Sequence, residues 1–264
     1  MGVTTARRAI TRMPKGADAA RIPDELAVEA PLILAMDGAA IATLMRTPGH
    51  DLELAAGWLV VESGVRSAED IARLRECRDD DTDRVHITLR PDVRRPRPRA
   101  FVTSSACGVC SADVLDLALL REAAPHRDGW CVPHAVLAAL PETMRDQQRC
   151  FQRTGAAHAA ALARADGTVL TVREDVGRHN AVDKIVGRAL FDGLLPTTDL
   201  LLVVSGRVSF EIVQKAVAAG VAGIVAVSAP SSLAVDLARE YGLLLAGMVR
   251  SDKLNLYAGE ALVG

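Results

Sequence analysis

Residues 199–229, DLLLVVSGRVSFEIVQKAVAAGVAGIVAVSA, contain two unbroken aliphatic runs with a stretch of helical spacing between them. Unbroken runs of Leu, Val and Ile are typical of strands buried on both faces, and strands that alternate with helices are typical of a parallel sheet. The alternation continues downstream, where a helix is expected over residues 231–242 and another aliphatic strand over 243–249. This stretch therefore predicts a layered α/β fold with a buried, largely parallel sheet.

The residues upstream extend the same α/β domain toward the N-terminus. Apolar spacing predicts helices over residues 112–123, 133–148 and 180–193, and alternation predicts two strands over 158–175. The two strands are expected to meet at the Asp166-Gly167 dipeptide, which favours a tight turn. We expect this α/β domain to span residues 113–264.

The N-terminal third predicts a smaller α+β domain over residues 26–92. Apolar runs on both sides of Asp37-Gly38 predict a hairpin, and residues 51–63 predict a helix that covers it. A second helix and a strand are expected to follow, over residues 67–77 and 84–90.

Residues 1–25 are expected to form a flexible basic tail. They contain the pair Arg7-Arg8, but no apolar run follows it, so they do not resemble a secretory or twin-arginine signal. The longest apolar stretch, residues 216–229, is too short and too interrupted by glycine to span a bilayer. We therefore expect a cytoplasmic protein.

The composition excludes several classes of protein. The 264 residues carry a formal net charge of -2, which gives no electrostatic reason to expect nucleic acid or a membrane as a partner. Only 3% of the residues are aromatic, so the core is expected to consist of aliphatic side chains. The 5 cysteines are odd in number and irregularly spaced, which indicates reduced thiols rather than a disulfide framework.

Cys107 and Cys110 form a CxxC pair in the segment TSSACGVCSA, residues 103–112. The pair ends a proline-rich connector over residues 93–112, whose arginines are Arg94, Arg95, Arg97 and Arg99. Arginines close to a thiol lower its pKa and favour the nucleophilic thiolate. Because the small residues around Gly108 favour a loop that reaches two partners in turn, the segment suits a sulfur carrier.

Three other roles stay open for this pair. A zinc site needs three or four ligands, and the chain has neither a second CxxC nor the H-x-E and P-C-x-x-C signature of zinc deaminases. A thioredoxin-like redox pair is expected between a strand and a helix, which a connector rich in arginine and proline does not provide. An inert thiol is the third alternative, since free cysteine is often a small buried hydrophobe. We favour sulfur carriage and expect no metal.

Two strand exits predict a site for an anionic ligand. Each passes from an aliphatic strand through Ser, with Gly or Pro, into a helix, and helix N-termini offer unpaired N–H groups to a phosphate. For any single serine, helix capping is the better explanation; this applies to Ser209, Ser231 and Ser232. The polar candidates at these exits and on the following helix are Ser205, Gly206, Arg207, Lys215 and Ser228. The segment GMVRSDKLN at residues 247–255 further favours a polar ligand.

The densest polar stretch is REDVGRHNAVDK, residues 173–184, at an expected strand-to-helix junction. A glycine at a tight turn, with Arg178 and His179 beside it, suits a phosphate or the edge of a purine. The structural alternative makes Asn180 a helix cap and the charges a solvated first turn. Both interpretations stay open at this point.

Five long motifs occur in one order along the chain: SSACGVC at residues 104–110, EDVGRHNAVDK at 174–184, SGRVSFEIVQKA at 205–216, AVSAPSSLA at 226–234 and GMVRSDKLNLY at 247–257. Together they resemble the FdhD family, the sulfur carrier proteins required for formate dehydrogenase activity. The resemblance covers about residues 28–258.

This resemblance implies a carrier that accepts sulfur from a cysteine desulfurase as a persulfide on Cys107, with Cys110 assisting. The sulfur is then delivered to the molybdenum cofactor, a bis-molybdopterin guanine dinucleotide, for a formate dehydrogenase apoprotein. The segment that matches the family's cofactor contact comprises Met248, Val249, Arg250, Ser251, Asp252 and Lys253. The resemblance also implies a cytidine-deaminase-like larger domain without zinc, and a homodimer.

Two rival hypotheses belong to other classes of protein. A chaperone that binds the molybdenum cofactor without covalent sulfur transfer predicts tight guanine-nucleotide binding with both cysteines dispensable. A metal-dependent deaminase predicts stoichiometric zinc in the purified protein, which elemental analysis measures.

Overall fold

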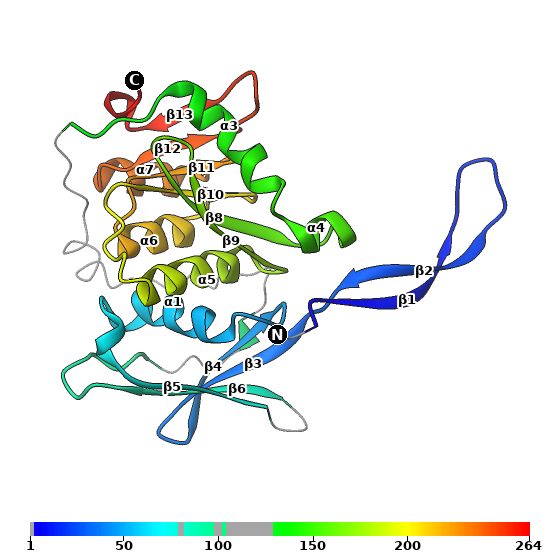
Figure 1. Cartoon of the computed structure of the whole chain (residues 1–264), viewed down its shortest axis with the longest axis horizontal. Helices are drawn as coiled ribbons and strands as arrows, with labels where there is room; N and C mark the ends of the chain where they lie inside the picture. Colours follow the sequence, from blue (N-terminus) through cyan, green and yellow to red (C-terminus); the bar gives the residue numbers. More distant parts are fainter. Residues whose placement is uncertain (1–2, 79–81, 98–101, 104–128) are drawn as a thin grey trace.

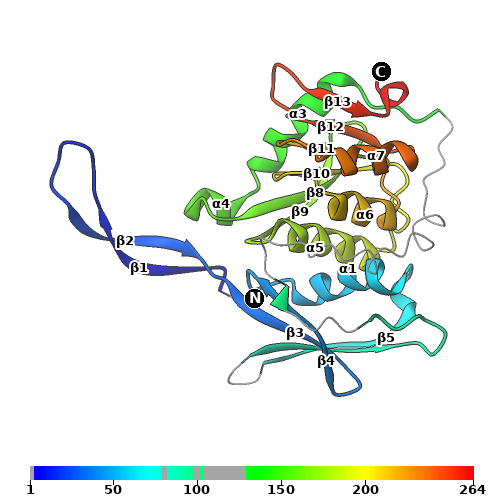
Figure 2. The same ribbon diagram turned by 180° about the vertical axis from the view of Figure 1, so that it is seen from behind.

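The structure is a computed structural model that describes residues 3–78, 82–97, 102–103 and 129–264. It contains two sheets with their helices, stacked in layers, and a two-stranded ribbon that projects away from them (Figures 1 and 2). The helices of the described part are α1 (Asp51–Ser63), α3 (His134–Arg145), α4 (Arg149–Thr154), α5 (Arg178–Phe191), α6 (Phe210–Ala219) and α7 (Ser232–Glu240).

The larger sheet has six strands in the order β13-β12-β11-β10-β8-β9. These strands are β8 (His158–Arg164), β9 (Val169–Asp175), β10 (Leu200–Val204), β11 (Gly223–Ala226), β12 (Leu244–Gly247) and β13 (Asn255–Ala258). β10, β11 and β12 are parallel neighbours, whereas β8, β9 and β13 pair antiparallel with the strands beside them. The predicted α/β class is confirmed, but the sheet is mixed rather than largely parallel.

Helices cover both faces of this sheet. α5, α6 and α7 pack on one face and α3 packs on the other (Figure 1). Along β10, Leu202 faces the first of these two cores, whereas Leu201 and Val203 face the second. Burial on both faces explains why this strand is an unbroken aliphatic run in the sequence.

The smaller sheet has five strands in the order β5-β6-β3-β4-β7. They are β3 (Ala30–Met36), β4 (Ala39–Arg46), β5 (Ile71–Arg78), β6 (Asp83–Leu89) and β7 (Val102–Thr103). α1 lies between this sheet and α5 (Figures 1 and 2). Leu34 of the sheet, Leu54 of α1 and Ile185 of α5 are fully buried in one continuous core. The expected division at residues 93–112 therefore does not divide the hydrophobic core.

Two glycines allow α1 and α5 to cross at close range. A Cβ at Gly57 would lie 1.8 Å from the carbonyl oxygen of Asp183, and a Cβ at Gly187 would lie 1.8 Å from that of Glu53. Such distances are far shorter than van der Waals contact, so each helix requires a residue without a side chain at the crossing.

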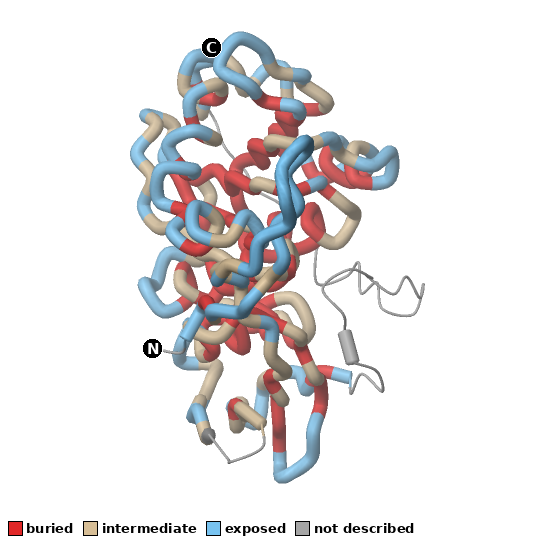
Figure 3. The backbone as a smooth tube through the Cα atoms, turned by 90° about the vertical axis from the view of Figure 1, so that its right-hand side faces the viewer, coloured by how far each residue is buried: buried red, intermediate tan, exposed pale blue. Residues whose placement is uncertain are grey.

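Residues 1–25 were expected to form a flexible tail, and this expectation is wrong for the described part. β1 (Thr5–Arg12) and β2 (Ala20–Ala27) pair antiparallel along their whole length. The ribbon is largely exposed, as the pale blue loop in Figure 3 shows. Because little of it is buried, its sequence carries no apolar alternation that would reveal the strands.

The helix expected over residues 67–77 is also wrong. A short 3-10 turn (Ala68–Asp70) leads directly into β5, which lies at an edge of its sheet. A bulge between Ile71 and Arg73 leaves Ile71, Leu74 and Cys77 partly buried. Their spacing of three residues imitates the period of a helix.

Candidate functional site

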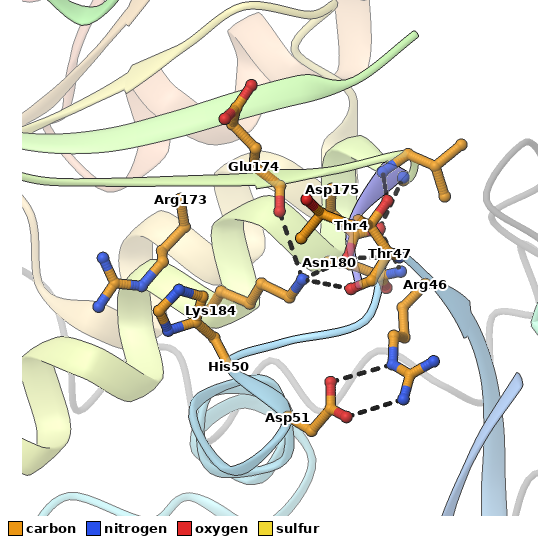
Figure 4. Close-up of polar contacts among 12 residues, drawn as sticks. Thr4, Arg46, Thr47, His50, Asp51, Arg173, Glu174, Asp175, Asn180 and Lys184 are labelled. Carbon is orange, nitrogen blue, oxygen red and sulfur yellow. Dashed lines mark hydrogen bonds and ion pairs between the residues drawn. The ribbon is translucent and has the colours of Figure 1, made fainter. Parts of the chain in front are cut away.

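The turn between β9 and α5 is held by the buried carboxylate of Asp175 (Figure 4). Its hydrogen-bond donors, at 2.7–3.1 Å, are the backbone N–H groups of Thr47 and Gly177 and the side chains of Asn180 and Lys184. This set of bonds fixes the position of Arg178, the first residue of α5.

The alternative in which Asn180 caps α5 and the charges form a solvated first turn is therefore wrong on both points. The N-cap of α5 is Gly177, and the amide of Asn180 instead donates to the carbonyl of Met45 at 2.8 Å. Asp183 and Lys184 are buried rather than solvated. The charges of this stretch join the two halves of the chain, as the contacts of Lys184 in Figure 4 illustrate.

Lys215 is not at a ligand-facing surface. Its Nζ lies 2.7 Å from Oδ1 of Asp183, and both side chains are at most 5% exposed. Burial raises the pKa of Asp183 to about 6, even though Lys215 opposes this effect. The structure thus places this candidate in an internal ion pair between α5 and α6.

The exits of β10 and β11 lie side by side, because Val208 and Pro230 form a parallel bridge. Ser231 caps α7, since its hydroxyl accepts from the backbone N–H of Ala234 at 3.3 Å. Ser209 is the N-cap of α6 but accepts no such bond. The capping interpretation is confirmed for Ser231 alone of these two.

Two arginines stand at helix N-termini that have no side-chain cap. Arg178 begins α5, and Arg207 lies exposed in the loop before α6. The Nε of Arg178 is buried and has no hydrogen-bond partner among the described residues. Burial and repulsion by Arg207 lower the pKa of Arg178, although Glu211 opposes this. Positive charge therefore exceeds negative charge here, which suits an anion.

His158, the first residue of β8, lies beside this arginine pair. Burial, Arg178 and Arg207 lower its pKa, against the attraction of Asp175. A Cβ at Gly206 would lie 3.3 Å from Nδ1 of His158 and 3.5 Å from Cβ of Arg178. Gly206 thus lies close to both His158 and Arg178, with little room for a side chain of its own.

A cavity of about 680 Å³ opens at this end of the larger sheet. Its walls come from α3, α4 and the segments that flank α4, from the start of β8, and from the residues that follow β9, β10, β11 and β12. The residues that line it include Glu142, Arg145, Gln148, Phe151, Gly155, Ala156, His158, Val176, Ser205, Val227, Val249, Arg250 and Ser251. The cavity lies at the carboxyl ends of the parallel strands, where open α/β sheets bind ligands.

The candidate segment 248–253 follows β12 into the same region. Val249, Arg250 and Ser251 line the cavity, and Nη1 of Arg250 donates to the carbonyl of Val227 at 2.7 Å. Met248 is 40% exposed and has a positive φ of 52°. Its backbone N–H donates to the carbonyl of Ser228 at 3.2 Å, which places that candidate beside the segment. The exposed residues Asp252 and Lys253 follow directly.

His179 points toward α6 rather than into the cavity. Its Nε2 lies 3.3 Å from the hydroxyl of Ser209 and 3.3 Å from the carboxylate of Glu211. Burial lowers the pKa of His179 to about 4, although Glu211 opposes the shift. This histidine is therefore neutral at neutral pH and supports the N-terminus of α6.

The residues that α3, α4 and the start of β8 contribute to the cavity were not predicted from the sequence. Arg145 and Gln148 lie in the segment 133–148, which was predicted only as a helix, and Phe151 lies in α4, which the sequence did not predict. His158 had one available signal: it is the polar first residue of the otherwise apolar run HAAALA, next to a glycine turn at Gly155.

Cys107 and Cys110 lie outside the described residues, as does the helix expected over residues 112–123. In the described part, no group of three or more His, Cys, Asp or Glu side chains is placed to hold a metal ion. Among the helices of that part, none combines the length and the apolar character needed to cross a membrane.

The fold and the cavity define a mixed α/β protein with a large cavity at the carboxyl ends of its parallel strands. The chain belongs to the FdhD/NarQ family, whose model matches residues 27–263. "Sulfur carrier protein FdhD" of Nocardia farcinica is 46% identical to it over 98% of this chain and 94% of the relative. The protein of the same name from Streptomyces coelicolor is 46% identical over 98% of this chain and 95% of the relative.

A solved structure confirms the fold. The crystal structure of a protein from Desulfotalea psychrophila, described as a formate dehydrogenase accessory protein, superposes with a TM-score of 0.81. It covers 99% of this chain and 100% of the solved chain at 24% identity. The likeness to the cytidine deaminase fold stays a prediction.

Proposed function

We propose that the protein is a sulfur carrier that takes sulfur from a cysteine desulfurase and transfers it to the molybdenum cofactor of a formate dehydrogenase. Its family membership and the names of its relatives support this proposal. The observation that carries it is the arginine pair, Arg178 and Arg207, whose charge is not balanced and which adjoins a large cavity. Such a site suits a ligand that joins phosphates to a ring system.

The substrate in this proposal is the bis-molybdopterin guanine dinucleotide form of the cofactor. Its pyrophosphate groups match Arg178, Arg207 and the uncapped N-termini of α5 and α6. The cavity, with Arg250 and Ser251 on its wall, is of the size that ligand sites commonly have. The exchange takes place in the cytoplasm, and a homodimer of this chain meets the desulfurase and the formate dehydrogenase apoprotein.

The covalent step belongs to Cys107. Its thiolate attacks the terminal sulfur of the donor's persulfide, the donor's S–S bond breaks, and the donor cysteine leaves as a thiolate. The terminal sulfur of the resulting Cys107 persulfide then reaches the cofactor as hydrosulfide, which displaces a ligand of the molybdenum. Cys110 assists release by attacking the Sγ of Cys107, which expels hydrosulfide and leaves a disulfide that an external thiol reduces.

Intact mass tests the carrier step. The protein is incubated with a cysteine desulfurase and cysteine, separated from the donor, and compared with the Cys107→Ala variant. We expect the wild type, but not the variant, to gain one sulfur that a thiol removes. A sulfur-free wild type that still binds guanine nucleotide contradicts the proposal and supports a cofactor-binding chaperone.

Titration with GDP, which corresponds to the guanosine and pyrophosphate portion of each dinucleotide, tests the anion site. Arg178→Ala and Arg207→Ala are each expected to weaken GDP binding roughly tenfold or more, since each removes a charged hydrogen-bond donor. Arg188→Ala is the matched control, because Arg188 lies in the last turn of α5 and pairs with Asp192. Unchanged affinity in folded Arg178→Ala and Arg207→Ala variants overturns the site.

A further inference from the structure

His158 joins the two parts of the site. It lines the cavity, and it also lies near Arg178 and Arg207, with Gly206 close to both His158 and Arg178. Ser205 and Val176 border the cavity on the same side, at the ends of β10 and β9. His158 is therefore placed to contact a ligand that occupies both the cavity and the region of the two arginines.

The imidazole is held in a way that serves both of its charge states. The hydroxyl of Ser205 lies 3.4 Å from Nδ1 of His158 and accepts from the backbone N–H of Ala159 at 2.9 Å. Its hydrogen is then available to Nδ1 of the neutral imidazole, whose proton sits on Nε2. After rotation of the hydroxyl, the second lone pair of Ser205 accepts from a protonated Nδ1.

The surroundings of His158 are positive on balance. Arg178 from α5 and Arg207 from the β10–α6 loop repel a proton on the imidazole, and the nearby His179 adds no negative charge. Asp175 at the end of β9 is the opposing acid, and its carboxylate already accepts hydrogen bonds, one of them from Lys184. Without an anion, burial and the two arginines therefore lower the pKa of His158 and disfavour a proton on the imidazole.

We propose that His158 contacts the phosphate groups of the bound nucleotide and takes up a proton when they bind. The inference rests on the proposed function, because it assumes an anionic nucleotide at this site. The phosphates offset the charges of Arg178 and Arg207 and add negative charge of their own, which raises the pKa of His158. The proton that binds Nδ1 comes from solvent. By linkage, the protein binds the nucleotide more tightly as the pH falls through the range in which the imidazole of the complex titrates.

Calorimetric titration with GDP, in buffers of different ionisation enthalpy, counts the protons taken up. We expect the wild type to take up more protons than His158→Asn, by up to about one per GDP. The variant is also expected to bind GDP more weakly than the wild type does. The loss of affinity is roughly tenfold or more at about pH 6 and much smaller at about pH 8. Comparing the two proteins with the same ligand cancels the titration of GDP itself.

His134→Asn is the matched control, because His134 is exposed at the start of α3 and does not line the cavity. It is expected to match the wild type in affinity and in proton uptake. His158→Gln is a second variant, and the imidazole NMR signal of wild-type His158, titrated with and without GDP, needs no variant. We expect GDP to raise the pKa that this signal reports.

The outcomes separate the two proposals. A wild type that binds no GDP overturns the nucleotide site itself. A wild type that binds GDP with the same proton uptake as the His158 variants, and with an unshifted imidazole titration, overturns the role of His158 and leaves the nucleotide site standing.

Discussion

Buried charges decide what several polar residues of the predicted site do. Lys215 was a candidate because a cation near a strand exit suits a phosphate, but it lies beneath the site and pairs with Asp183. The sequence cannot distinguish a lysine that binds phosphate from one that forms an internal ion pair, since either can lie a turn or so into the helix. Arg178 and Arg207 differ from Lys215 in having no carboxylate hydrogen-bonded to them in the described part.

Replacing Lys215 tests this assignment at the residue scale. In Lys215→Met the carboxylate of Asp183 is buried without its cation, so we expect the free energy of unfolding in urea to fall by roughly 3–5 kcal/mol. The double variant Asp183→Asn, Lys215→Met buries no charge and is expected to lose much less. If the double variant is no more stable than the single one, the buried charge is not the cause.

The carboxylate of Glu53 makes the free energy of unfolding depend on pH in the acidic range. Burial raises its pKa, but the hydrogen bonds from Arg173 and His50 outweigh burial and lower the pKa to about 2. A carboxyl group with a lowered pKa stabilises the folded state above its ordinary pKa of 4.5, and this contribution is lost as the pH falls from there to about 2.

The loss of this contribution is measured as the free energy of unfolding at a series of pH values. Arg173→Met is expected to lower the free energy of unfolding at neutral pH by roughly 1–3 kcal/mol, because Arg173 supplies one of the two hydrogen-bonded partners that lower this pKa. It should also flatten the dependence of stability on pH between about 5 and about 2. A variant that keeps the slope of the wild type in this range would falsify the role of Arg173.

At the scale of the elements, the sequence predicted those that are buried. The helices expected over residues 51–63 and 180–193 correspond closely to α1 and α5, and the Asp37-Gly38 hairpin joins β3 and β4. The errors lie where burial is slight: in the ribbon of β1 and β2 and in the edge strand β5. A pattern that arises from burial cannot reveal a strand that is mostly exposed.

The close crossing of α1 and α5 predicts how alanine in place of either crossing glycine changes the stability. In an isolated helix, Gly→Ala raises stability by roughly 0.5–1 kcal/mol. Here Gly57→Ala forces a Cβ against the carbonyl of Asp183, so we expect it to lower the free energy of unfolding by about 1–3 kcal/mol or more. Gly187→Ala, against Glu53, should act in the same direction. Chemical denaturation measures both, and an increase in stability for either variant would show that the helices do not cross this closely.

At the scale of the whole molecule, the sequence predicted which strand exits lie together but not which helices form the other walls of the cavity. The strand exits with Arg178, Arg207 and residues 249–251 come together at one end of the larger sheet, as the topology of parallel strands requires. The wall from α3 could not be foreseen, because α3 packs on the opposite face of the sheet and its apolar residues follow a helical pattern that packing alone explains. The wall from α4 was missed because that helix has only six residues, too few for a periodic pattern.

The continuous core predicts how the whole chain unfolds. The core that α5 contributes to includes Leu54 and Leu59 of α1 and Leu34 of the smaller sheet, so neither half of the chain buries its own apolar surface alone. We expect scanning calorimetry to show one transition, with equal calorimetric and van't Hoff enthalpies. A fragment of residues 113–264 lacks α1 and exposes the apolar side of α5, so it should aggregate or unfold at a lower temperature than the full chain. Two separated transitions, or a fragment as stable as the full chain, would mean that residues 26–92 and 113–264 are independent domains, as the sequence had predicted.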